Sequence, residues 1–420
     1  MVGEPNIGAR LNPLPIAATY SKDPAFWGVD FEPQYLLHGD GAQVLGSDGK
    51  MYLDWVSALG ANLLGYNHSE FVLRVQRQIG LGAGFSLPHS LEAQVAEKLA
   101  WLLGEHVPGW TPEGINVRFG LTGTDATTMA VRLARAVTGH HRILSFGYHG
   151  WGTWSIAKTP PHWGINGGEE WHIVDIPFNV LDTLHSWLQS PNFPIAAIIL
   201  EQPMQDPEPD YYAELRRLCN QYGVLLILDE VVTGFRFALG GAAEVYGVEP
   251  DIACYGKALG NGIPISCIVG HKEYFDWFRR NDPVFVSSTH FGNAVSLAAA
   301  DAVLDIWNQD CVNHIYGVGA ALMSSLTVMG GFKMIGHAPR SLLQFNSPYE
   351  RAYFILGMRD RGILMNRPNI PNLAHNQGRK DVAETAIAAA AVKREMDALG
   401  PDGLEAQMKD RLPRVLFEGR

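Results

Sequence analysis

The stretch VLLILDEVVTGFRF, residues 224–237, indicates the fold class of this chain. Five apolar residues, 224–228, run directly into Asp229 and Glu230. A short apolar run bounded by polar residues is typical of a strand that is buried on both faces of a parallel sheet. A carboxylate at the end of such a strand is costly unless it has a partner. Asp229 therefore caps a helix, pairs with Arg236, or meets a positively charged group of a ligand.

Similar apolar runs recur on both sides of this stretch and alternate with helical patterns. Apolar residues recur with helical spacing at LEAQVAEKLAWLL (91–103) and ATTMAVRLARAV (126–137). The remaining strand-like runs are INVRFGL (115–121), RILSFG (142–147), AAIILEQ (196–202), DIACYG (251–256) and ISCIVG (265–270). Alternation of this kind predicts an α/β fold with a mostly parallel sheet.

The chain divides into three parts by pattern. Residues 1–60 are rich in turns around short antiparallel strands and are predicted to form the N-terminal part of a small lobe. Residues 61–305 carry the large α/β domain. Residues 306–420 mix a helix at 314–329, a strand at 341–346 and a final helix at 381–399. We expect this last part to form a smaller α+β domain together with the N-terminal segment.

Composition narrows the class of protein. The chain has 420 residues and a formal net charge of −11, which argues against a nucleic-acid partner or an anionic membrane surface. No apolar run approaches the roughly 20 residues that span a bilayer, and the N-terminus lacks a secretory pattern. Four cysteines without CxxC spacing suggest reduced thiols rather than disulfides or a metal site. We expect a cytoplasmic enzyme without a metal.

Two further strand ends carry polar groups that could meet a ligand. In LTGTDATTMAVRLARAV (121–137), Gly123 and Thr124 follow Thr122 at the start of a helix. Backbone amides there can hold a phosphate, although a simple helix cap explains the same residues. No P-loop and no GxGxxG is present. In SFGYHGW (145–151), Tyr148 or His149 could face a planar ligand or could pack in the core.

The stretch DIACYGKALGNG, residues 251–262, places Lys257 directly after an apolar run. Lysine prefers water, and a solvated lysine is the simple explanation. However, the strand before it and the strand that ends at Asp229 would deliver an amine and an acid to one edge of the sheet. Burial would lower the pKa of Lys257 and make the amine a nucleophile for a carbonyl. A carboxylate nearby could hold a protonated ring nitrogen, as pyridoxal 5'-phosphate requires.

Taken together, these motifs resemble the class III aminotransferases, pyridoxal-phosphate enzymes of fold type I. The resemblance covers nearly the whole chain, and the members nearest to it are similar to glutamate-1-semialdehyde aminomutases. It rests on an ordered series: TGTDA (122–126), YHG (148–150), LDEVVTGFR (228–236), GVEPDIACYGKALGNGIPIS (247–266) and SSTHFGN (287–293).

The resemblance implies a role for each matching residue. Lys257 matches the family's Schiff-base lysine, which forms the internal aldimine and shuttles a proton. Asp229 matches the aspartate that keeps the pyridine nitrogen protonated. Gly123 and Thr124 match the turn that binds the cofactor phosphate. Tyr148 matches the aromatic residue that stacks on the cofactor ring.

The resemblance also implies a partner subunit. Thr289 matches a threonine that reaches the phosphate of the neighbouring subunit, so the family likeness implies a homodimer with shared active sites. Two positions depart from common family patterns. Val232 stands where many members have glutamine near the cofactor's phenolic oxygen. The segment EQPMQDPEPD (201–210) lacks the second glutamate of EPxxGE, so the corresponding carboxylate gate is expected to be absent and Glu201 has no assigned role.

Three functions are compatible with these residues. An aminotransferase would move an amino group from a small-molecule amino donor to a carbonyl acceptor. A glutamate-1-semialdehyde-type 2,1-aminomutase would use one substrate as donor and acceptor. A non-catalytic cofactor-binding protein is a third alternative, but such a protein does not need both Lys257 and Asp229. The substrate stays open, and the arginines that could bind its carboxylate are Arg10, Arg236, Arg340 and Arg367.

Overall fold

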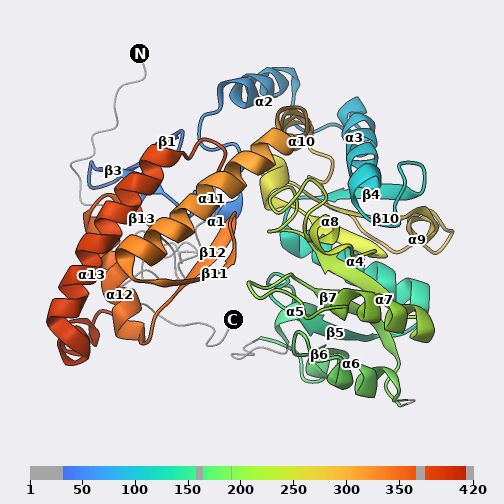
Figure 1. Ribbon diagram of the computed structural model, residues 1–420. Helices are drawn as coiled ribbons and strands as arrows, with labels where there is room; N and C mark the ends of the chain where they lie inside the picture. The colour runs from blue at the N-terminus through green and yellow to red at the C-terminus, as the bar shows by residue number, and fades with distance from the viewer. Residues whose placement is uncertain (1–31, 158–163, 191, 366–373, 413–420) are drawn as a thin grey trace.

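The computed structural model describes residues 32–157, 164–190, 192–365 and 374–412. A seven-stranded sheet with the order β4-β10-β9-β8-β7-β5-β6 forms the centre of the larger of two lobes (Figure 1). Strands β5 to β9 pair in parallel, and β10 lies antiparallel between β4 and β9. The mostly parallel sheet predicted from the apolar runs is confirmed. Its strands are β4 (Ile115–Gly120), β5 (Arg142–Phe146), β6 (Ile173–Asp175), β7 (Ile195–Leu200), β8 (Leu225–Asp229), β9 (Ile252–Tyr255) and β10 (Ser266–His271).

Both faces of this sheet are covered, as the continuous apolar runs require. In β8, Leu226 and Leu228 belong to one buried cluster, whereas Leu225 and Ile227 belong to another. Successive strand residues point to opposite faces, so each face packs under its own layer of helices. The helices of this lobe are α2 (Ser69–Leu81), α3 (Ser90–His106), α4 (Gly123–Thr138), α5 (Thr153–Ile156), α6 (Leu181–Leu188), α7 (Tyr211–Tyr222), α8 (Ala242–Tyr246), α9 (Lys272–Phe275) and α10 (Ala294–Ile306), with 3-10 turns η3 (Glu169–His172), η4 (Lys257–Gly260) and η5 (Asp276–Phe278).

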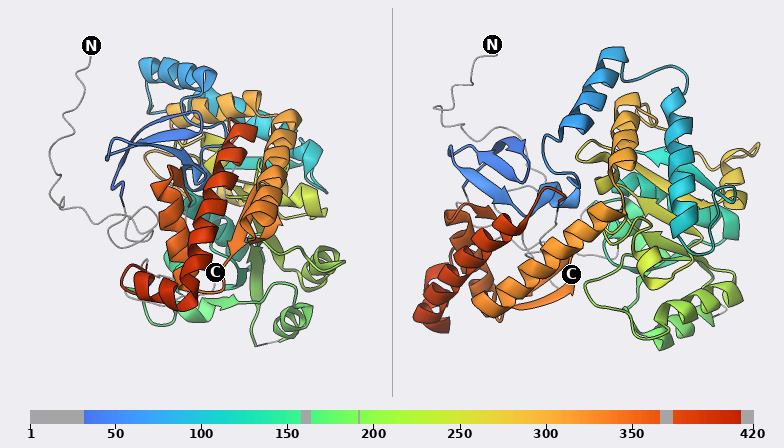
Figure 2. Two further views of the ribbon diagram at one scale, coloured as in Figure 1. Left: turned by 60° about the vertical axis from the view of Figure 1, so that its left-hand side comes forward. Right: turned by 45° about the horizontal axis from the view of Figure 1, so that its top comes forward.

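The smaller lobe combines segments from both ends of the described chain (Figure 2). Strand β13 pairs in parallel with β3, so the C-terminal part extends the N-terminal meander. The indole of Trp55 also donates to Thr385 Oγ1 at 2.9 Å. The elements of this lobe are β1 (Leu36–Asp40), β2 (Gln43–Gly46), β3 (Met51–Asp54), α1 (Ser57–Gly60), α11 (Gln309–Gly330), β11 (Lys333–His337), β12 (Arg340–Gln344), α12 (Pro348–Asp360), β13 (Ile363–Leu364) and α13 (Arg379–Met408).

Two helices of the small lobe differ from the sequence expectation. The sequence pattern does not indicate helix α12, because the apolar residues of this segment show little helical periodicity. Pro348 at its first position and the Ser347 cap, which accepts from the Glu350 amide, explain where it starts. Helix α13 was predicted to end near residue 399 and continues to Met408 across a kink at Gly400, directly before Pro401. The domain boundaries drawn at residues 60 and 305 stay a prediction.

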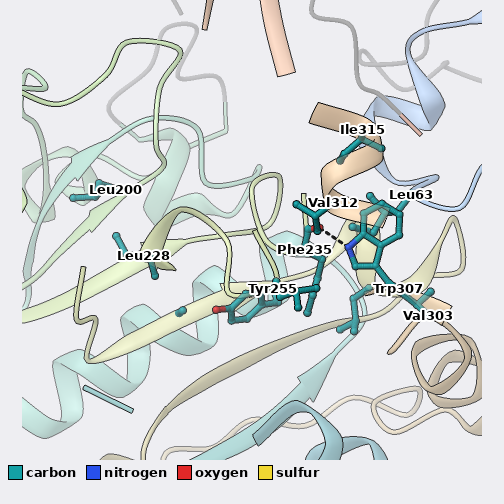
Figure 3. Close-up of a cluster of buried hydrophobic side chains, with 14 of the residues drawn as sticks. Leu63, Leu200, Leu228, Phe235, Tyr255, Val303, Trp307, Val312 and Ile315 are labelled. Carbon is teal, nitrogen blue, oxygen red and sulfur yellow. Dashed lines mark hydrogen bonds between the residues drawn. The ribbon is translucent and has the colours of Figure 1, made fainter. Parts of the chain in front are cut away.

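A buried cluster joins the two lobes (Figure 3). The indole of Trp307, at the end of α10, donates to the Phe235 carbonyl at 2.7 Å, as the dashed line in Figure 3 marks. Val312 and Ile315 of α11 and Leu63 surround this contact. The start of α11 is thus packed against the segment that follows β8.

Helix α11 is also the one helix in the described ranges that length and composition alone would allow to cross a membrane, over residues 309–328. Its apolar side is nevertheless occupied, since Ile315, Leu322 and Leu326 are buried in the protein core. Core helices of globular proteins pass the same test, so this composition carries no argument for a span.

Candidate active site

Asp229 and Lys257 lie at the carboxyl edge of the sheet, on neighbouring strands. Asp229 is the last residue of β8 and stands opposite Cys254 of β9 in the parallel register. Lys257 follows the end of β9 by two residues and begins the turn η4. The sequence predicted that one sheet edge would receive both groups, and the strand pairing confirms this placement.

The backbone at Lys257 is strained. Its φ of 41° lies in the left-handed region, which a residue with a side chain rarely adopts and which costs on the order of 1–3 kcal/mol. The turn is held from outside, since Asn261 Oδ1 accepts from the Leu64 amide at 2.8 Å and Asn261 Nδ2 donates to the Gly65 carbonyl at 3.2 Å. Strain of this kind persists only where the surroundings enforce it, and it is common where a side chain must be aimed at a ligand.

The surroundings of Lys257 favour its neutral form. Burial lowers the pKa of Lys257 from 10.5 to about 8. Among the charged groups, Glu201 raises this pKa most and Arg340 lowers it. Asp229 raises it and Arg236 lowers it by smaller amounts. A neutral amine is therefore abundant near pH 8, whereas an exposed lysine is almost fully protonated there.

The partner of Asp229 is His149. The His149 Nδ1 atom lies 2.7 Å from Asp229 Oδ2, and both side chains are buried, at 0% and 4% exposed. The Val231 amide donates to the other oxygen, Asp229 Oδ1, at 3.1 Å. In the described structure His149 Nε2 is buried without a hydrogen-bond partner. The sequence pattern indicates His149 only as a ring that could face a planar ligand or pack in the core. Its contact with Asp229 was missed because the two residues are 80 positions apart in the chain.

The start of α4 has the features of an anion site. Thr122 caps the helix through a capping box with Asp125, whose carboxylate accepts from the Leu121 and Thr122 amides. The amides of Gly123 and Thr124 lie outside that box, at the positive end of a 16-residue helix. The cap explanation is confirmed for Thr122, whereas phosphate binding by Gly123 and Thr124 stays a prediction.

Glycines let the backbone approach this helix start closely. A Cβ atom at Gly123 would lie 2.9 Å from Val231 Cγ1. Gly150 has a φ of 88°, and a Cβ there would overlap Thr124 Oγ1. The Thr124 hydroxyl also accepts from the Trp151 amide at 3.3 Å. The YHG segment therefore packs directly onto the start of α4.

The structure brings Glu201 and Arg340 together across the lobes. Arg340 Nη1 lies 3.1 Å from Glu201 Oε1, and the side chains are only 13% and 14% exposed. Glu201 follows β7, and Arg340 begins β12. Of the other candidate arginines, Arg236 is buried and donates to the Gly60 carbonyl at 2.6 Å. Arg10 and Arg367 lie outside the described residues.

Two predicted cofactor contacts are exposed. The Tyr148 side chain is 51% exposed, and Thr289 lies in an exposed segment before α10. That segment is anchored to the sheet through Arg118, which donates to the Val286 carbonyl at 3.1 Å. The roles assigned to Tyr148 and Thr289 therefore stay predictions. Val232 is partly exposed, directly after the Val231 side chain that meets Gly123.

Comparison with known proteins agrees with this arrangement. The family described as Aminotransferase class-III matches residues 31–340. A glutamate-1-semialdehyde 2,1-aminomutase of Symbiobacterium thermophilum is 30% identical over an aligned length of 401 residues, and the match covers 87% of this chain and 91% of that protein.

Solved structures give the same result. An omega-transaminase from Sphaerobacter thermophilus matches with a TM-score of 0.80 at 25% identity, covering 88% of this chain and 93% of the other. The PLP internal aldimine form of the FumI protein of Sphingopyxis sp. MTA144 matches with a TM-score of 0.82 at 26% identity, covering 93% and 94%. The expected fold type I and the expected enzyme class are confirmed. This chain belongs to the class-III aminotransferase family.

Proposed function

We propose that this protein is a pyridoxal 5'-phosphate-dependent aminotransferase that moves an amino group from a small-molecule donor to a carbonyl acceptor. The observation that carries the proposal is the placement of Lys257 and of the Asp229–His149 pair at the ends of neighbouring strands. An amine of lowered pKa beside a buried carboxylate is the combination that binding and activating this cofactor requires.

The residues present fit the cofactor. The amides of Gly123 and Thr124, the Thr124 hydroxyl and the dipole of α4 would hold the phosphate. Asp229 would hold the protonated ring nitrogen, and Lys257 would hold the aldehyde carbon. Glycine is required at position 123 of this phosphate site, because a side chain there would collide with Val231. When bound, the cofactor supplies an electron-withdrawing ring that stabilises negative charge at the substrate α-carbon.

The chain itself supplies the proton transfers and the charges. With a pKa of about 8, roughly half of the Lys257 amines are neutral at pH 8, and such an amine both attacks a carbonyl and accepts a proton at Nζ. The contact with His149 orients the Asp229 carboxylate, and both side chains are buried. The Glu201–Arg340 pair sets the local charge around Lys257.

A 2,1-aminomutase is the second candidate, favoured by the 30% identity to an enzyme of that name. A screen separates the two. The enzyme loaded with cofactor is mixed with glutamate, alanine, simple amines or glutamate-1-semialdehyde, and the spectrum and products are recorded. A transferase converts the cofactor to its amine form with a donor alone and needs an acceptor to return. A mutase isomerises glutamate-1-semialdehyde with no second substrate.

We also propose a homodimer with shared active sites. Three exposed apolar side chains support this proposal: Leu81 at the end of α2, and Phe85 and Leu87 in the loop that follows. The Ala83 carbonyl of that loop accepts from the Ala294 amide at 2.8 Å, five residues after Thr289. Light scattering would measure the mass of the assembly. Mixing inactive Lys257→Ala subunits with Thr289→Ala subunits should restore one intact site per mixed dimer if Thr289 acts on its neighbour.

We propose a cytoplasmic location as well. The four cysteines of the protein are buried free thiols, as is common in a reducing compartment. Cell fractionation with an antibody tests this location directly.

A further inference from the structure

We propose that His337, Tyr246 and Asp206 form a latch between the lobes, and that this interlobe latch seats Arg340 against Glu201 beside Lys257. His337 and Tyr246 are then positioning residues, since they act on the site only through Arg340. The inference concerns this chain's own residues and is tested first on protein without cofactor, so it can fail or succeed independently of the proposed function.

The β11–β12 hairpin couples the latch to the site. Only Ala338 and Pro339 separate the two strands, and His337 stands directly opposite Arg340 in the antiparallel register. Residues directly opposite each other in such a pair project their side chains from the same face of the sheet. His337 and Arg340 therefore face the large lobe together, and a shift of one moves the other.

The latch joins this hairpin to the large lobe by a chain of hydrogen bonds. The Tyr246 hydroxyl lies 2.8 Å from His337 Nε2 and donates to Asp206 Oδ1 at 2.9 Å. One hydroxyl has one proton to donate, so His337 must carry its hydrogen on Nε2 and donate it to the tyrosine oxygen. Burial lowers the pKa of His337, Arg340 adds to this effect, and Asp206 opposes it. Because the net pKa is lowered, the ring is neutral at neutral pH.

Packing confines the hairpin turn on three sides. The His337 ring lies against Phe237, with the ring centroids 4.5 Å apart. Gly336 has a φ of 91°, and a Cβ there would lie 3.0 Å from Met204 Sδ. Gly319 of α11 allows the closest approach, since a Cβ at that position would overlap the Ala338 carbonyl oxygen. The turn therefore has little room to move while the latch is closed.

The position of Arg340 has a consequence for Lys257. The charged groups that act on this amine are Glu201 and Asp229, which raise its pKa, and Arg340 and Arg236, which lower it. If Arg340 moves away, one cation is lost and the Glu201 carboxylate is no longer neutralised. Both changes stabilise the protonated amine, so opening the latch must raise the pKa of Lys257.

The test measures the pKa of Lys257 in the full-length protein freed of cofactor. A small acylating reagent is applied across pH 6 to 11, and mass spectrometry of the Lys257 peptide gives the rate at each pH. Arg340→Met should raise the midpoint by about one unit, which makes acylation at pH 7 about tenfold slower. Tyr246→Phe should also raise the midpoint and should make acylation at pH 7 about threefold slower. In the Arg340→Met background, Tyr246→Phe should add nothing.

Matched variants separate positioning from general damage. Tyr222→Phe removes another tyrosine hydroxyl that contacts a histidine, His185 Nε2 at 3.4 Å, but that pair lies within the large lobe. It should leave the Lys257 midpoint unchanged. His337→Gln retains a side-chain N–H donor and should lie closer to wild type than His337→Ala. In the protein loaded with pyridoxal 5'-phosphate, the pH midpoint of the visible absorption should rise most in Arg340→Met, less in Tyr246→Phe and not at all in Tyr222→Phe.

Two results would overturn the latch. One is a folded Tyr246→Phe protein whose Lys257 midpoint equals that of wild type. The other is an additive effect of Tyr246→Phe in the Arg340→Met background, because this would mean that the tyrosine acts on Lys257 without Arg340.

Discussion

Replacement of Asp229 by asparagine should keep the fold and remove most of the turnover. Asparagine has nearly the same shape, and its carbonyl oxygen can still accept one of the two hydrogen bonds, from His149 or from the Val231 amide. The substitution removes the negative charge. Because Asp229 is only 4% exposed, water cannot replace that charge as the partner of a protonated ring nitrogen.

The size of the effect follows from the burial of the site. Removing one member of a buried ion pair typically costs about 3–5 kcal/mol. If that stabilisation is lost in the transition state, a factor of ten in rate for each 1.36 kcal/mol gives a decrease of roughly 10²- to 10⁴-fold. Asp229→Ala should be worse in stability too, because the buried His149 Nδ1 then has no partner, at a further cost of about 1–3 kcal/mol.

The assay is a single half-reaction with an amino donor, followed by the absorbance of the cofactor, with circular dichroism to show that each variant is folded. Asp251→Asn is the matched control. Asp251 is also buried, but it precedes β9 at the opposite edge of the sheet, where it accepts from Arg216 Nη1 at 2.8 Å and from the Leu226 amide at 2.6 Å. This control should lose stability and keep its rate within about threefold, since its carboxylate stabilises the fold only.

Near-normal turnover in Asp229→Asn would show that the carboxylate is not the counter-charge of the ring nitrogen. An equal loss in folded Asp251→Asn would show that the rate reports general damage to the sheet rather than the charge at its carboxyl edge.

Two further predictions concern Lys257 and the start of α4. Without cofactor, the acylation rate of Lys257 should rise about tenfold per pH unit up to a midpoint near pH 8 and then level off. Glu201→Gln should lower this midpoint, because an anion that stabilises the protonated amine is lost. A wild-type midpoint near 10.5 would contradict the lowered pKa. Gly150→Ala should weaken cofactor retention in equilibrium dialysis by about tenfold or more, because its methyl group would overlap Thr124 Oγ1. Gly139→Ala is the control, since Gly139 also has a positive φ, at 70°, but no atom lies within 4 Å of the added carbon. Equal cofactor binding by both variants would contradict the proposed phosphate site at Gly123 and Thr124.

The core of the fold and the placement of Asp229 and Lys257 at one sheet edge could be predicted because they depend on local patterns. The run at 224–228 is apolar because both faces of β8 are buried, and the same reasoning located β7 and β9. Lys257 stood out because a lysine directly after such a run needs a reason. The antiparallel direction of β10 could not be predicted, since a fully buried strand has the same apolar pattern in either direction.

Contacts between distant segments could not be predicted from patterns. The His149–Asp229 contact depends on β5 and β8 ending at the same sheet edge, with β7 between them. The Glu201–Arg340 pair joins residues 139 positions apart in different lobes, so no spacing rule finds it. The sequence indicates Asp229, His149 and Arg340 as candidates and leaves Glu201 without a role, and only the arrangement of the strands and lobes shows which of these residues meet.

The covalent role of Lys257 can be tested most directly by chemical trapping. The protein loaded with pyridoxal 5'-phosphate is treated with borohydride, digested, and mapped by mass spectrometry. We expect a phosphopyridoxyl mass on the peptide that contains Lys257 and on no other lysine peptide, and no adduct in Lys257→Ala. A stable adduct on a different lysine, or the same adduct yield in Lys257→Ala, would contradict the assignment of Lys257 as the anchor of the cofactor.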